Sequence, residues 1–355
     1  MPTGKSVTIK DVARIAGVSQ STVSKALNGS AEVSEPTRAR IAATAARVGY
    51  RPNAIARSLK VQRTHTLGVI TDDQEGAFTT AMVHGVADFA SGRGYGVFLC
   101  NSYGRVAKER QHIELLLDKQ VEGIIMTGFK VEQRGAPAAP TGDLPIVYLY
   151  SYTTSTDSPC ILPDDEGGAR LATEHLLELG SRRIGFINGP PSYEATHLRR
   201  AGYEDTLRAR GMYDPALIRV AGDWNQDSGF RLAQQLVEQD EPPEAILCAS
   251  DELAAGAILG LTQLNIRVPD DVAIVGFDDR PFAAHLPIPL TTIALPLLDM
   301  GRQAAERLFD AIAGEPVVNE QIRIPCRLVV RASSRADRQA VAVAKNGSSR
   351  TPPPA

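Results

Sequence analysis

The sequence predicts a small all-α headpiece followed by a larger α/β domain built from two doubly wound lobes. Residues 8–60 contain short apolar stripes at helical spacing, separated by glycine and serine and free of strand-like runs. Beyond residue 66, short continuous apolar runs alternate with amphipathic helical segments, a pattern typical of parallel strands buried on both faces. A chain of 355 residues has room for both domains.

The first two helices are predicted from caps and apolar spacing. Thr8 is the expected N-cap of the first helix, with Asp11 three residues on, and Gly17 ends it because glycine adopts left-handed turn conformations. Ser19 is the expected cap of the second helix, which turns Val23 inward and polar side chains outward. Such a pair reads DNA bases with its second helix, although helical hairpins also occur as plain packing units.

A third helix and a short basic segment complete the headpiece. Ser34 is the expected cap of the third helix, Pro36 lies in its first turn, and Gly49 ends it. Residues 51–60 follow as a segment too short to be helical alone in water, so we expect it to fold only against a partner.

The distribution of charge along the chain indicates what kind of partner this is. Residues 1–63 contain eleven Lys and Arg against three Asp and Glu, a net charge of +8, whereas the whole chain carries −3. The remainder of the chain is therefore acidic, at −11, and the basic character is confined to the headpiece. A nucleic-acid phosphate backbone is the natural partner of such a segment.

The headpiece resembles that of the LacI/GalR family of bacterial transcription regulators, and the resemblance continues to about Ser334. The matching stretches are Val7-Thr-Ile-Lys-Asp-Val-Ala, Ala16-Gly-Val-Ser, Thr22-Val-Ser, Gly49-Tyr-Arg-Pro-Asn53 and Ala56-Arg-Ser-Leu-Lys60. The resemblance implies a helix-turn-helix headpiece with a hinge helix, and behind it a two-lobed, periplasmic-binding-protein-like (type I) effector domain. It also implies a near-palindromic double-stranded DNA operator and a homodimer.

The resemblance assigns roles to headpiece residues. Gln20, Ser21 and Lys25 fall where the family reads the major groove, and Leu59 falls where a hinge-helix wedge enters the minor groove. Lys25 stands where the family often has arginine, and lysine lacks the rigid fork that reads guanine. The predicted DNA-binding residues are Thr8, Ser19, Gln20, Ser21, Thr22, Ser24, Lys25, Asn28, Tyr50, Asn53, Ala56, Arg57, Leu59 and Lys60.

The predicted domain boundaries are 1–60 for the headpiece and hinge helix, 61–66 for a linker, 67–334 for the effector domain and 335–355 for a disordered tail. The first lobe is expected to contain strands 67–70, 96–100, 123–126 and 146–150, with helices 78–93 and 108–119. The second lobe is expected to contain strands 183–187, 218–221, 245–248 and 272–276, with helices 168–179, 198–210, 226–239 and 253–264. Helix 297–313 and strands near 322–324 and 328–331 are expected to tie the lobes together.

Open α/β sheets bind ligands beyond the carboxyl ends of their strands, which selects Asp72, Asp251 and Asp278. Together with Arg199 and Trp224 these carboxylates suit a sugar, whose hydroxyl pairs accept and donate hydrogen bonds and whose C–H face stacks on a ring. Capping of the next helix is an equal alternative for Asp73 and Asp251. The resemblance adds weight to Arg199 and Asp278 and implies that Phe78 and Phe282 line the pocket.

The loop 71–78 lacks the aromatic pattern common in the family, which favours a carbohydrate over a purine. We therefore predict a repressor of carbohydrate uptake or catabolism genes that is controlled by a sugar. One alternative is a regulator of the same family that responds to a purine or another metabolite. Another is a sugar-binding receptor without DNA binding, which would need an export signal that the polar residues 1–6 do not supply.

Other function classes lack their signals. A run of about 18 apolar residues does not occur, so we expect a cytoplasmic protein without a membrane partner. Neither a G-x-x-x-x-G-K-[ST] loop nor a G-x-S-x-G elbow is present, and the six histidines lack metal-ligand spacing. We therefore expect no catalytic site, no metal and no cofactor.

Two further expectations concern cysteines and assembly. The four cysteines are expected on strands as buried, reduced thiols. The dimer is expected to pair partly through the helix that contains Ala81, Met82, Gly85, Val86 and Phe89. Because the tail lacks leucine heptads, a dimer is expected and not a tetramer.

Overall fold

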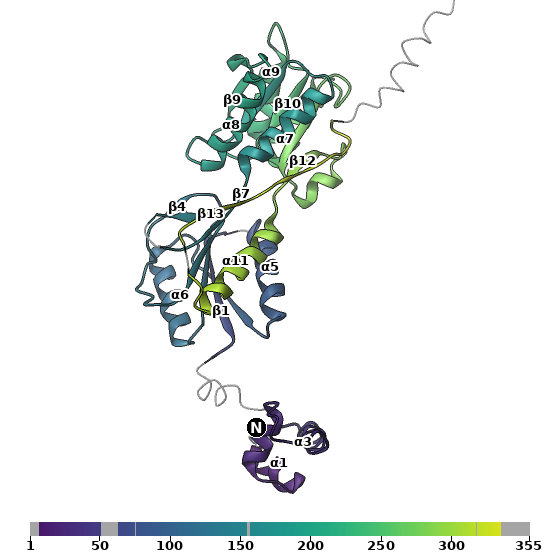
Figure 1. Cartoon of the computed structure of the whole chain (residues 1–355). Coiled ribbons are helices and arrows are strands. Elements are labelled where there is room, and N and C mark those ends of the chain that lie inside the picture. The colour runs from purple at the N-terminus through teal and green to yellow at the C-terminus, as the bar shows by residue number, and fades with distance from the viewer. Residues whose placement is uncertain (1–6, 51–62, 75, 155–156, 317, 335–355) are drawn as a thin grey trace, which may run out of the picture. The chain divides into compact units, whose positions relative to one another are not determined.

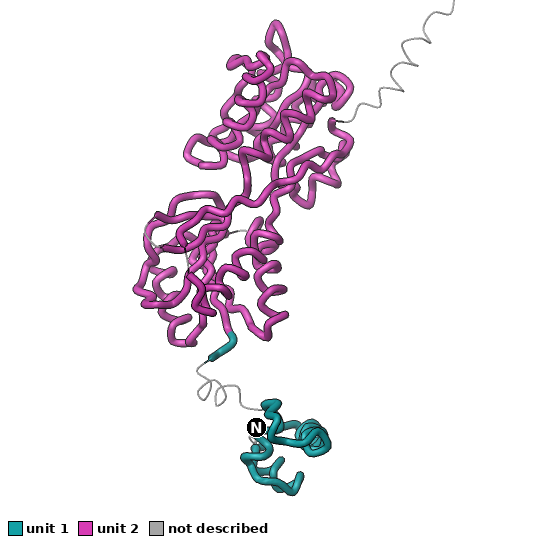
Figure 2. Tube along the Cα trace, viewed as in Figure 1, with its two compact units in different colours: residues 1–65 teal, residues 66–355 magenta. Residues whose placement is uncertain are grey.

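The computed structural model describes residues 7–50, 63–74, 76–154, 157–316 and 318–334. The chain divides into two compact units, residues 1–65 and residues 66–355, shown in different colours in Figure 2. The unit boundary falls inside the segment that the sequence predicts as a linker. The predicted hinge helix at 51–60 and the predicted disordered tail at 335–355 lie outside the described residues.

The described residues of the first unit form three helices, α1 (Ile9–Ala16), α2 (Gln20–Leu27) and α3 (Glu35–Arg47) (Figure 1). One fully buried side chain from each helix, Val12, Val23 and Ile41, meets in a common core. The three helices predicted for the headpiece are therefore confirmed.

Caps set the ends of these helices. The Asp11 carboxylate accepts hydrogen bonds from the Thr8 backbone N–H (3.0 Å) and hydroxyl (2.8 Å), and Gly17 ends α1 with φ of 65°. The Ser19 hydroxyl accepts from the Thr22 N–H at 3.1 Å, as predicted. The prediction for Ser34 is wrong in detail, because its hydroxyl donates to the Thr37 hydroxyl and caps no backbone N–H.

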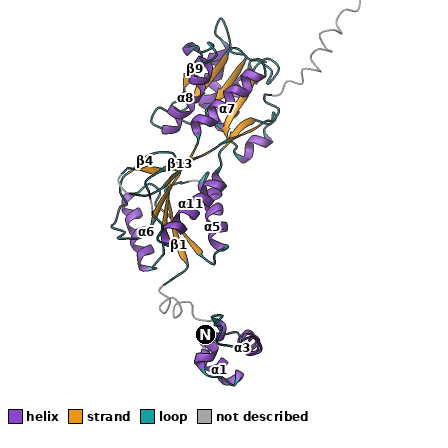
Figure 3. Ribbon diagram, in the orientation of Figure 1, coloured by secondary structure: helices purple, strands orange, loops and turns teal. Residues whose placement is uncertain are grey.

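The second unit contains two α/β lobes, whose helices and strands are coloured separately in Figure 3. The sheet of the first lobe has the strand order β13-β7-β5-β3-β1-β2, and all of its pairings are parallel. Its strands are β1 (Thr66–Thr71), β2 (Gly96–Asn101), β3 (Ile124–Thr127), β5 (Ile146–Leu149), β7 (Cys160–Pro163) and β13 (Gln321–Ile324). A short pair, β4 (Gln133–Arg134) and β6 (Tyr152–Thr153), lies apart from this sheet.

Helices cover both faces of the first-lobe sheet. Val69 of β1 packs in one core with α5 (Thr79–Ser91) and α11 (Leu297–Ile312). The next residue, Ile70, packs in another core with α6 (Val106–Asp118). Successive strand residues point to opposite faces, so this run of apolar residues is buried on both sides, as the sequence predicts.

The second lobe repeats the arrangement with the strand order β14-β12-β11-β10-β8-β9, in which only the β12–β14 pairing is antiparallel. Its strands are β8 (Ile184–Asn188), β9 (Ile218–Val220), β10 (Ala245–Cys248), β11 (Ala273–Asp278), β12 (Thr291–Ala294) and β14 (Arg327–Val329). Its helices are α7 (Asp165–Glu178), α8 (Glu194–Arg208), α9 (Gln226–Val237) and α10 (Asp251–Gln263), with 3₁₀ turns η1 (Pro215–Leu217) and η2 (Pro281–His285).

The described chain passes between the lobes after β7, after β12 and between β13 and β14. The last two passages return the chain to the first lobe and then to the second, so α11, β13 and β14 tie the lobes together as predicted. One hydrophobic core extends from Val69 of the first lobe to Phe277 and Ile293 of the second. The two lobes therefore form one compact unit.

The structure differs from the sequence predictions in further respects. The strands β7 and β12 have no counterpart among the predicted elements. Cys326 lies between β13 and β14 and not on a strand, although all four cysteines are free thiols. In the helix predicted to take part in the dimer interface, Met82, Gly85 and Val86 pack against α11, so these three residues are not available to a partner, whereas Ala81 and Phe89 are partly exposed.

The contact between α5 and α11 generates a stability prediction. A Cβ on Gly85 would lie 2.1 Å from the Leu298 carbonyl oxygen, so Gly85→Ala must push the helices apart. We expect this variant to lose about 1–3 kcal/mol of unfolding free energy in urea, followed by tryptophan fluorescence. Gly92→Ala at the end of the same helix is the control, because its Cβ would meet nothing closer than 3.7 Å. Equal stability of the two variants would contradict the close helix contact.

Candidate ligand cleft and DNA-reading helix

A cavity of about 150 Å³ lies between the two lobes of the second unit. The first lobe contributes Phe78, Phe129, Lys130, Val131 and Tyr150 to its wall. The second lobe contributes Tyr193, Ala195, Arg199, Trp224, Ser250, Glu252, Asp278 and Arg280. Several of these residues follow the carboxyl ends of parallel strands, which is where open α/β sheets bind ligands. The wall combines aromatic rings with a few charged groups, as small-molecule sites do.

Arg199 of α8 is the most deeply buried charged residue of the cavity wall, with 3% of its surface exposed. Its Nε donates to Asp165 Oδ1 at 2.7 Å, and its Nη1 donates to the Ala249 carbonyl at 2.6 Å. The Phe277 ring lies beneath the guanidinium, with its centroid 3.8 Å from Cζ. Burial alone would lower the pKa of Arg199, but Asp165 and Asp278 outweigh burial and raise it, so the group stays charged.

Asp278 lies at the end of β11 with 9% of its side chain exposed. Its Oδ1 is 3.4 Å from Arg199 Nη1 and makes no hydrogen bond to the described residues. Burial raises the pKa of Asp278 to about 7, although Arg199 acts in the opposite direction. Asp278 and Asp279 both have positive φ, 113° and 56°, and Arg331 anchors Asp279 at 2.7 Å. Strained backbone of this kind persists where the surroundings hold a functional side chain in place.

Trp224 forms an aromatic platform in the second lobe. A Cβ on Gly189 would lie 2.0 Å from the Trp224 ring, so the indole packs directly on the glycine backbone after β8. Tyr193 meets the ring edge to face, with centroids 5.5 Å apart. The indole is therefore held on one side by backbone and along an edge by a second ring, while it also lines the cleft.

The first lobe supplies the opposite wall. The Phe78 and Tyr150 rings lie 5.5 Å apart at an interplanar angle of 34°. Tyr150 is 3% exposed, and burial raises the pKa of its hydroxyl well above the ordinary value. Lys130 Nζ lies 5.2 Å from the Tyr193 ring centroid, and Arg280 Cζ lies 5.4 Å from that of Phe78. These two cation–π contacts join the lobes across the cleft.

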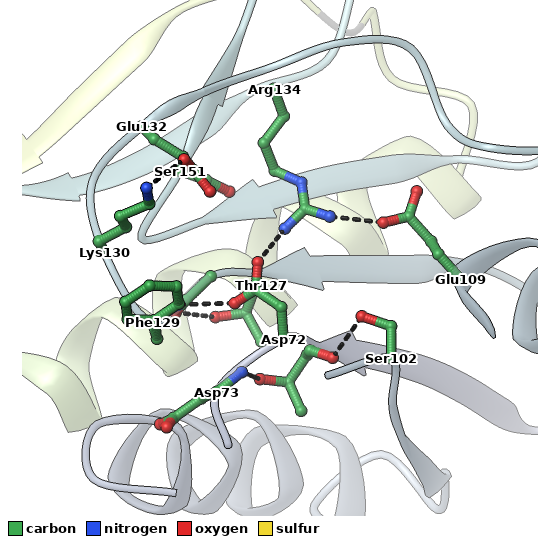
Figure 4. A network of polar contacts seen from close by, with 12 residues as sticks. Asp72, Asp73, Ser102, Glu109, Thr127, Phe129, Lys130, Glu132, Arg134 and Ser151 are labelled. Carbon is green, nitrogen blue, oxygen red and sulfur yellow. Dashed lines mark hydrogen bonds and ion pairs between the residues drawn. The ribbon is translucent and has the colours of Figure 1, made fainter. Parts of the chain in front are cut away.

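Asp72 does not line this cavity, contrary to the prediction that it contacts an effector. Its carboxylate accepts from the Phe129 N–H at 2.8 Å and from Arg134 Nη1 at 2.9 Å, and Arg134 also pairs with Glu109 (Figure 4). Burial raises the pKa of Asp72, and Arg134 opposes that effect. Asp72 therefore fixes the segment that carries Phe129 and Lys130 into the cleft.

The carboxylates of Asp73 and Asp251, which also follow strands, likewise bond to groups of the protein. Asp73 accepts hydrogen bonds from the N–H groups of Gly76, Phe78 and Thr79, so it caps the start of α5. Asp251 is fully buried, and it accepts from the Thr292 hydroxyl at 2.5 Å and the Arg280 N–H at 2.6 Å. The structure therefore does not bring Asp251 to the cavity wall, and Ser250, not Asp251, caps α10.

Phe282 lies in η2, is partly buried and does not line the cavity, again unlike the prediction. Phe78, Arg199, Trp224 and Asp278 are brought together in the cavity wall. Sequence reasoning missed Phe129, Lys130, Tyr150, Tyr193, Glu252 and Arg280. Tyr150 and Phe129 follow β5 and β3, so the rule that ligands bind beyond the carboxyl ends of strands could have found them. No local sequence pattern marks Lys130 or Tyr193.

In the first unit, α2 presents Gln20, Ser21 and Lys25 as exposed side chains, which is what a base-reading surface requires. Lys25 pairs with Glu32 in the free chain. Ser19 and Thr22 bond to each other through the helix cap, and Asn28 reaches the Ser24 hydroxyl at 3.4 Å. Thr8 and Tyr50 are described, whereas Asn53, Ala56, Arg57, Leu59 and Lys60 lie outside the described residues.

Two further properties hold for the described residues. None of their helices combines the length and apolar character needed to cross a membrane. No group of three or more His, Cys, Asp or Glu among them is arranged to hold a metal ion.

Comparisons with known proteins match both units. A family model described as bacterial regulatory proteins, lacI family, matches residues 8–53. A model of a periplasmic binding protein-like domain matches residues 173–334.

Whole-chain relatives agree with these matches. Catabolite control protein A of Priestia megaterium is 33% identical over 330 residues, which cover 93% of this chain and 99% of the relative. A structure of the lac repressor dimer bound to operator and the anti-inducer ONPF has a TM-score of 0.76 at 30% identity, covering 94% of this chain and 100% of that one. A complex of the transcriptional regulator CelR with cellobiose has a TM-score of 0.64 at 30% identity, covering 92% and 100%.

The buried carboxylates generate a pH prediction. Burial raises the pKa of Asp251 to about 8 in the folded chain, and the charge of Asp278 adds to the effect. Because this pKa is raised, the contribution of the protonated carboxyl to stability is full below about pH 4 and is lost as the pH rises through about 8. We therefore expect the thermal midpoint of Asp251→Asn to approach that of the wild type between about pH 4 and pH 8. Exposed Asp205→Asn is the control, and parallel curves for Asp251→Asn and wild type would refute the assignment.

Proposed function

Because this chain belongs to the lacI family of bacterial regulatory proteins, we propose that it represses genes of carbohydrate uptake or catabolism under the control of a sugar. The family consists of regulatory proteins, so the chain is a transcription regulator and not an enzyme. In this proposal the first unit binds operator DNA in the cytoplasm, and the sugar binds between the lobes of the second unit.

The observation that carries the proposal is the grouping of Arg199, Asp278 and Trp224 in one cavity wall. A guanidinium and a carboxylate can bind neighbouring sugar hydroxyls, and the indole can stack on the C–H face of the ring. The CelR structure, whose cellobiose complex is one of the similar structures, supports a sugar as the ligand class.

A homodimer is part of the proposal, supported by the dimeric lac repressor structure. Two-fold symmetry would present two α2 helices to the two halves of a near-palindromic operator. Beside the exposed positions of α5, the edge strand β2 is a second candidate interface in the first lobe. Its Phe98 and Leu99 are 47% and 53% exposed, which is unusual for large apolar side chains on a strand.

Regulation requires that the sugar bind one arrangement of the lobes more tightly than another. The wall of the cavity comes from both lobes, so a ligand there stabilises the closed arrangement. In a dimer, closure changes how the first lobes are placed, and β1 of each first lobe follows directly on the DNA-binding unit in the sequence. This connection is the proposed route from the sugar to the operator.

A purine is the second candidate ligand, and the aromatic content of the cleft favours it. Phe78, Phe129, Tyr150, Tyr193 and Trp224 all line the cavity, and planar bases stack on such rings. A binding assay that compares sugars with purines distinguishes the two ligand classes.

The DNA-binding role predicts losses in α2 variants. Gln20→Ala and Lys25→Ala should each weaken binding to a selected operator by about 1–3 kcal/mol, because each removes a side chain placed to contact a base edge. The measurement is fluorescence anisotropy at fixed salt, with an operator selected from random palindromic sequences by the wild-type protein. Exposed Arg210→Ala is the control for loss of one positive charge. Unchanged affinity and base preference in both α2 variants would show that α2 does not read the operator.

The proposed effector site predicts that a substitution on α8 removes sugar binding and leaves operator binding. Arg199→Ala should abolish the heat of sugar binding in calorimetry and the sugar response of operator binding, while operator binding itself persists. Arg200→Ala is the matched control, because the neighbouring Arg200 is exposed and pairs with Glu204. Trp224 is the sole tryptophan and lines the cavity, so its fluorescence reports occupancy independently. A full sugar response in Arg199→Ala would remove the proposed site.

A further inference from the structure

We propose that the ligand of the cleft carries an anionic group, a carboxylate or a phosphate ester, which the Arg280 guanidinium binds. The inference rests on the proposed function, since it concerns the same cleft, and it names the chemical class of the sugar as a sugar acid or a sugar phosphate. Neutral sugars are the alternative that the experiment below separates.

Arg280 lies where two hollows meet. It lines the cavity between the lobes and also an adjoining hollow of about 320 Å³ formed with Asp73, Gln74, Ala77, Phe78 and Phe129. Phe78 and Phe129 likewise line both. A ligand that lies against Trp224 in the first hollow and extends toward the second therefore passes the Arg280 side chain.

The three cations in the cavity wall differ in their partners. Arg199 pairs with Asp165 and Asp278, and Lys130 Nζ lies 2.9 Å from Glu132. Arg280, by contrast, has no carboxylate oxygen within 4.0 Å among the described residues. Burial raises the pKa of Asp278, and Arg280 lowers it less than Arg199 does, while no ion pair within 4.0 Å joins Arg280 to Asp278 among the described residues. The cleft thus contains one positive charge without a carboxylate in contact in the described structure.

Arg280 is also held in a fixed position. Its backbone N–H donates to Asp251 Oδ2 at 2.6 Å, and its guanidinium carbon lies 5.4 Å from the Phe78 ring centroid. A guanidinium presents a planar fork of N–H donors, which matches the paired oxygens of a carboxylate or phosphate. The backbone of Arg280 is therefore anchored, and its side chain lies within cation–π distance of Phe78.

Two buried atoms at this wall make no hydrogen bond to the described residues, Arg280 Nε and Asp278 Oδ1. Buried donors and acceptors are rarely left without partners, because desolvation without a hydrogen bond is unfavourable. Both belong to residues that line the cavity, so this wall contains polar groups whose hydrogen-bonding capacity is not used within the described structure.

The experiment is calorimetry of the full-length protein with matched sugars that differ only in the anionic group. The neutral probes are D-glucose, D-galactose and D-ribose, and each is compared with its uronate, which keeps the sugar ring, and with its terminal phosphate. The variants are Arg280→Gln, which removes the charge, and Arg280→Lys, which keeps the charge without the planar fork. Arg210→Gln is the control for an exposed arginine outside the cleft.

We expect at least one anionic probe to bind the wild type more tightly than its neutral parent, on the order of ten- to a hundredfold. Arg280→Gln should erase that preference, Arg280→Lys should retain part of it, and Arg210→Gln should leave it unchanged. The uronate and phosphate arms identify which anion is preferred.

Equal affinity for neutral and anionic probes, or a preference that survives in Arg280→Gln, would overturn this inference and leave the sugar-controlled regulator standing. Absence of binding by every probe, with operator binding intact, would overturn both this inference and the sugar proposal. Operator binding of each Arg280 variant, measured in parallel, shows that the variant is folded.

Discussion

The ion pairs of Arg199 organise the ligand cleft. The guanidinium is almost inaccessible to water and is compensated by Asp165 from α7 and Asp278 from the end of β11, so three separate elements converge on one charge. Removing one partner of such a buried arrangement leaves an unpaired charge, typically at a cost of about 3–5 kcal/mol. The end of β11 and the start of α7 are therefore held together, and with them the position of Asp279 and Arg280.

The topology explains why this charge lies beside the other lobe. Parallel strands place all their carboxyl ends at one edge of each sheet, and the described chain passes between the lobes at that edge, next to Asp165 after β7. Loops there carry irregular backbone, including Asp278 with φ of 113°, because strands and helices on both sides fix their ends. The fold thus supplies a rigid frame and leaves the side chains of the strand ends to determine chemistry.

The fold could be predicted largely from local patterns, because apolar runs and helical stripes report burial directly. The strands β7 and β12 escaped because their sequences, Cys160-Ile-Leu-Pro163 and Thr291-Thr-Ile-Ala294, place a proline or two threonines where a continuous apolar run was sought. Site residues were harder, since Asp72 and Asp278 both follow strands and look alike in the sequence. Asp72 has a structural role because its carboxylate pairs with Arg134, which is distant in the sequence. Asp278 pairs with Arg199 and still lines the cleft. Likewise, the apolar face of α5 gives no sign that α11, more than 200 residues later, covers it.

The contacts across the cleft explain how a ligand can act on lobe arrangement. Arg280 of the second lobe lies over Phe78 of the first, and Lys130 of the first lies over Tyr193 of the second. Each contact is weak, about 0.5–2 kcal/mol, so the lobes are not locked together by them. A ligand can shift an equilibrium only by the difference between its affinities for the two states. An anion at Arg280 meets that requirement, because it would bind a second-lobe charge while its sugar ring contacts the aromatic wall of the first lobe.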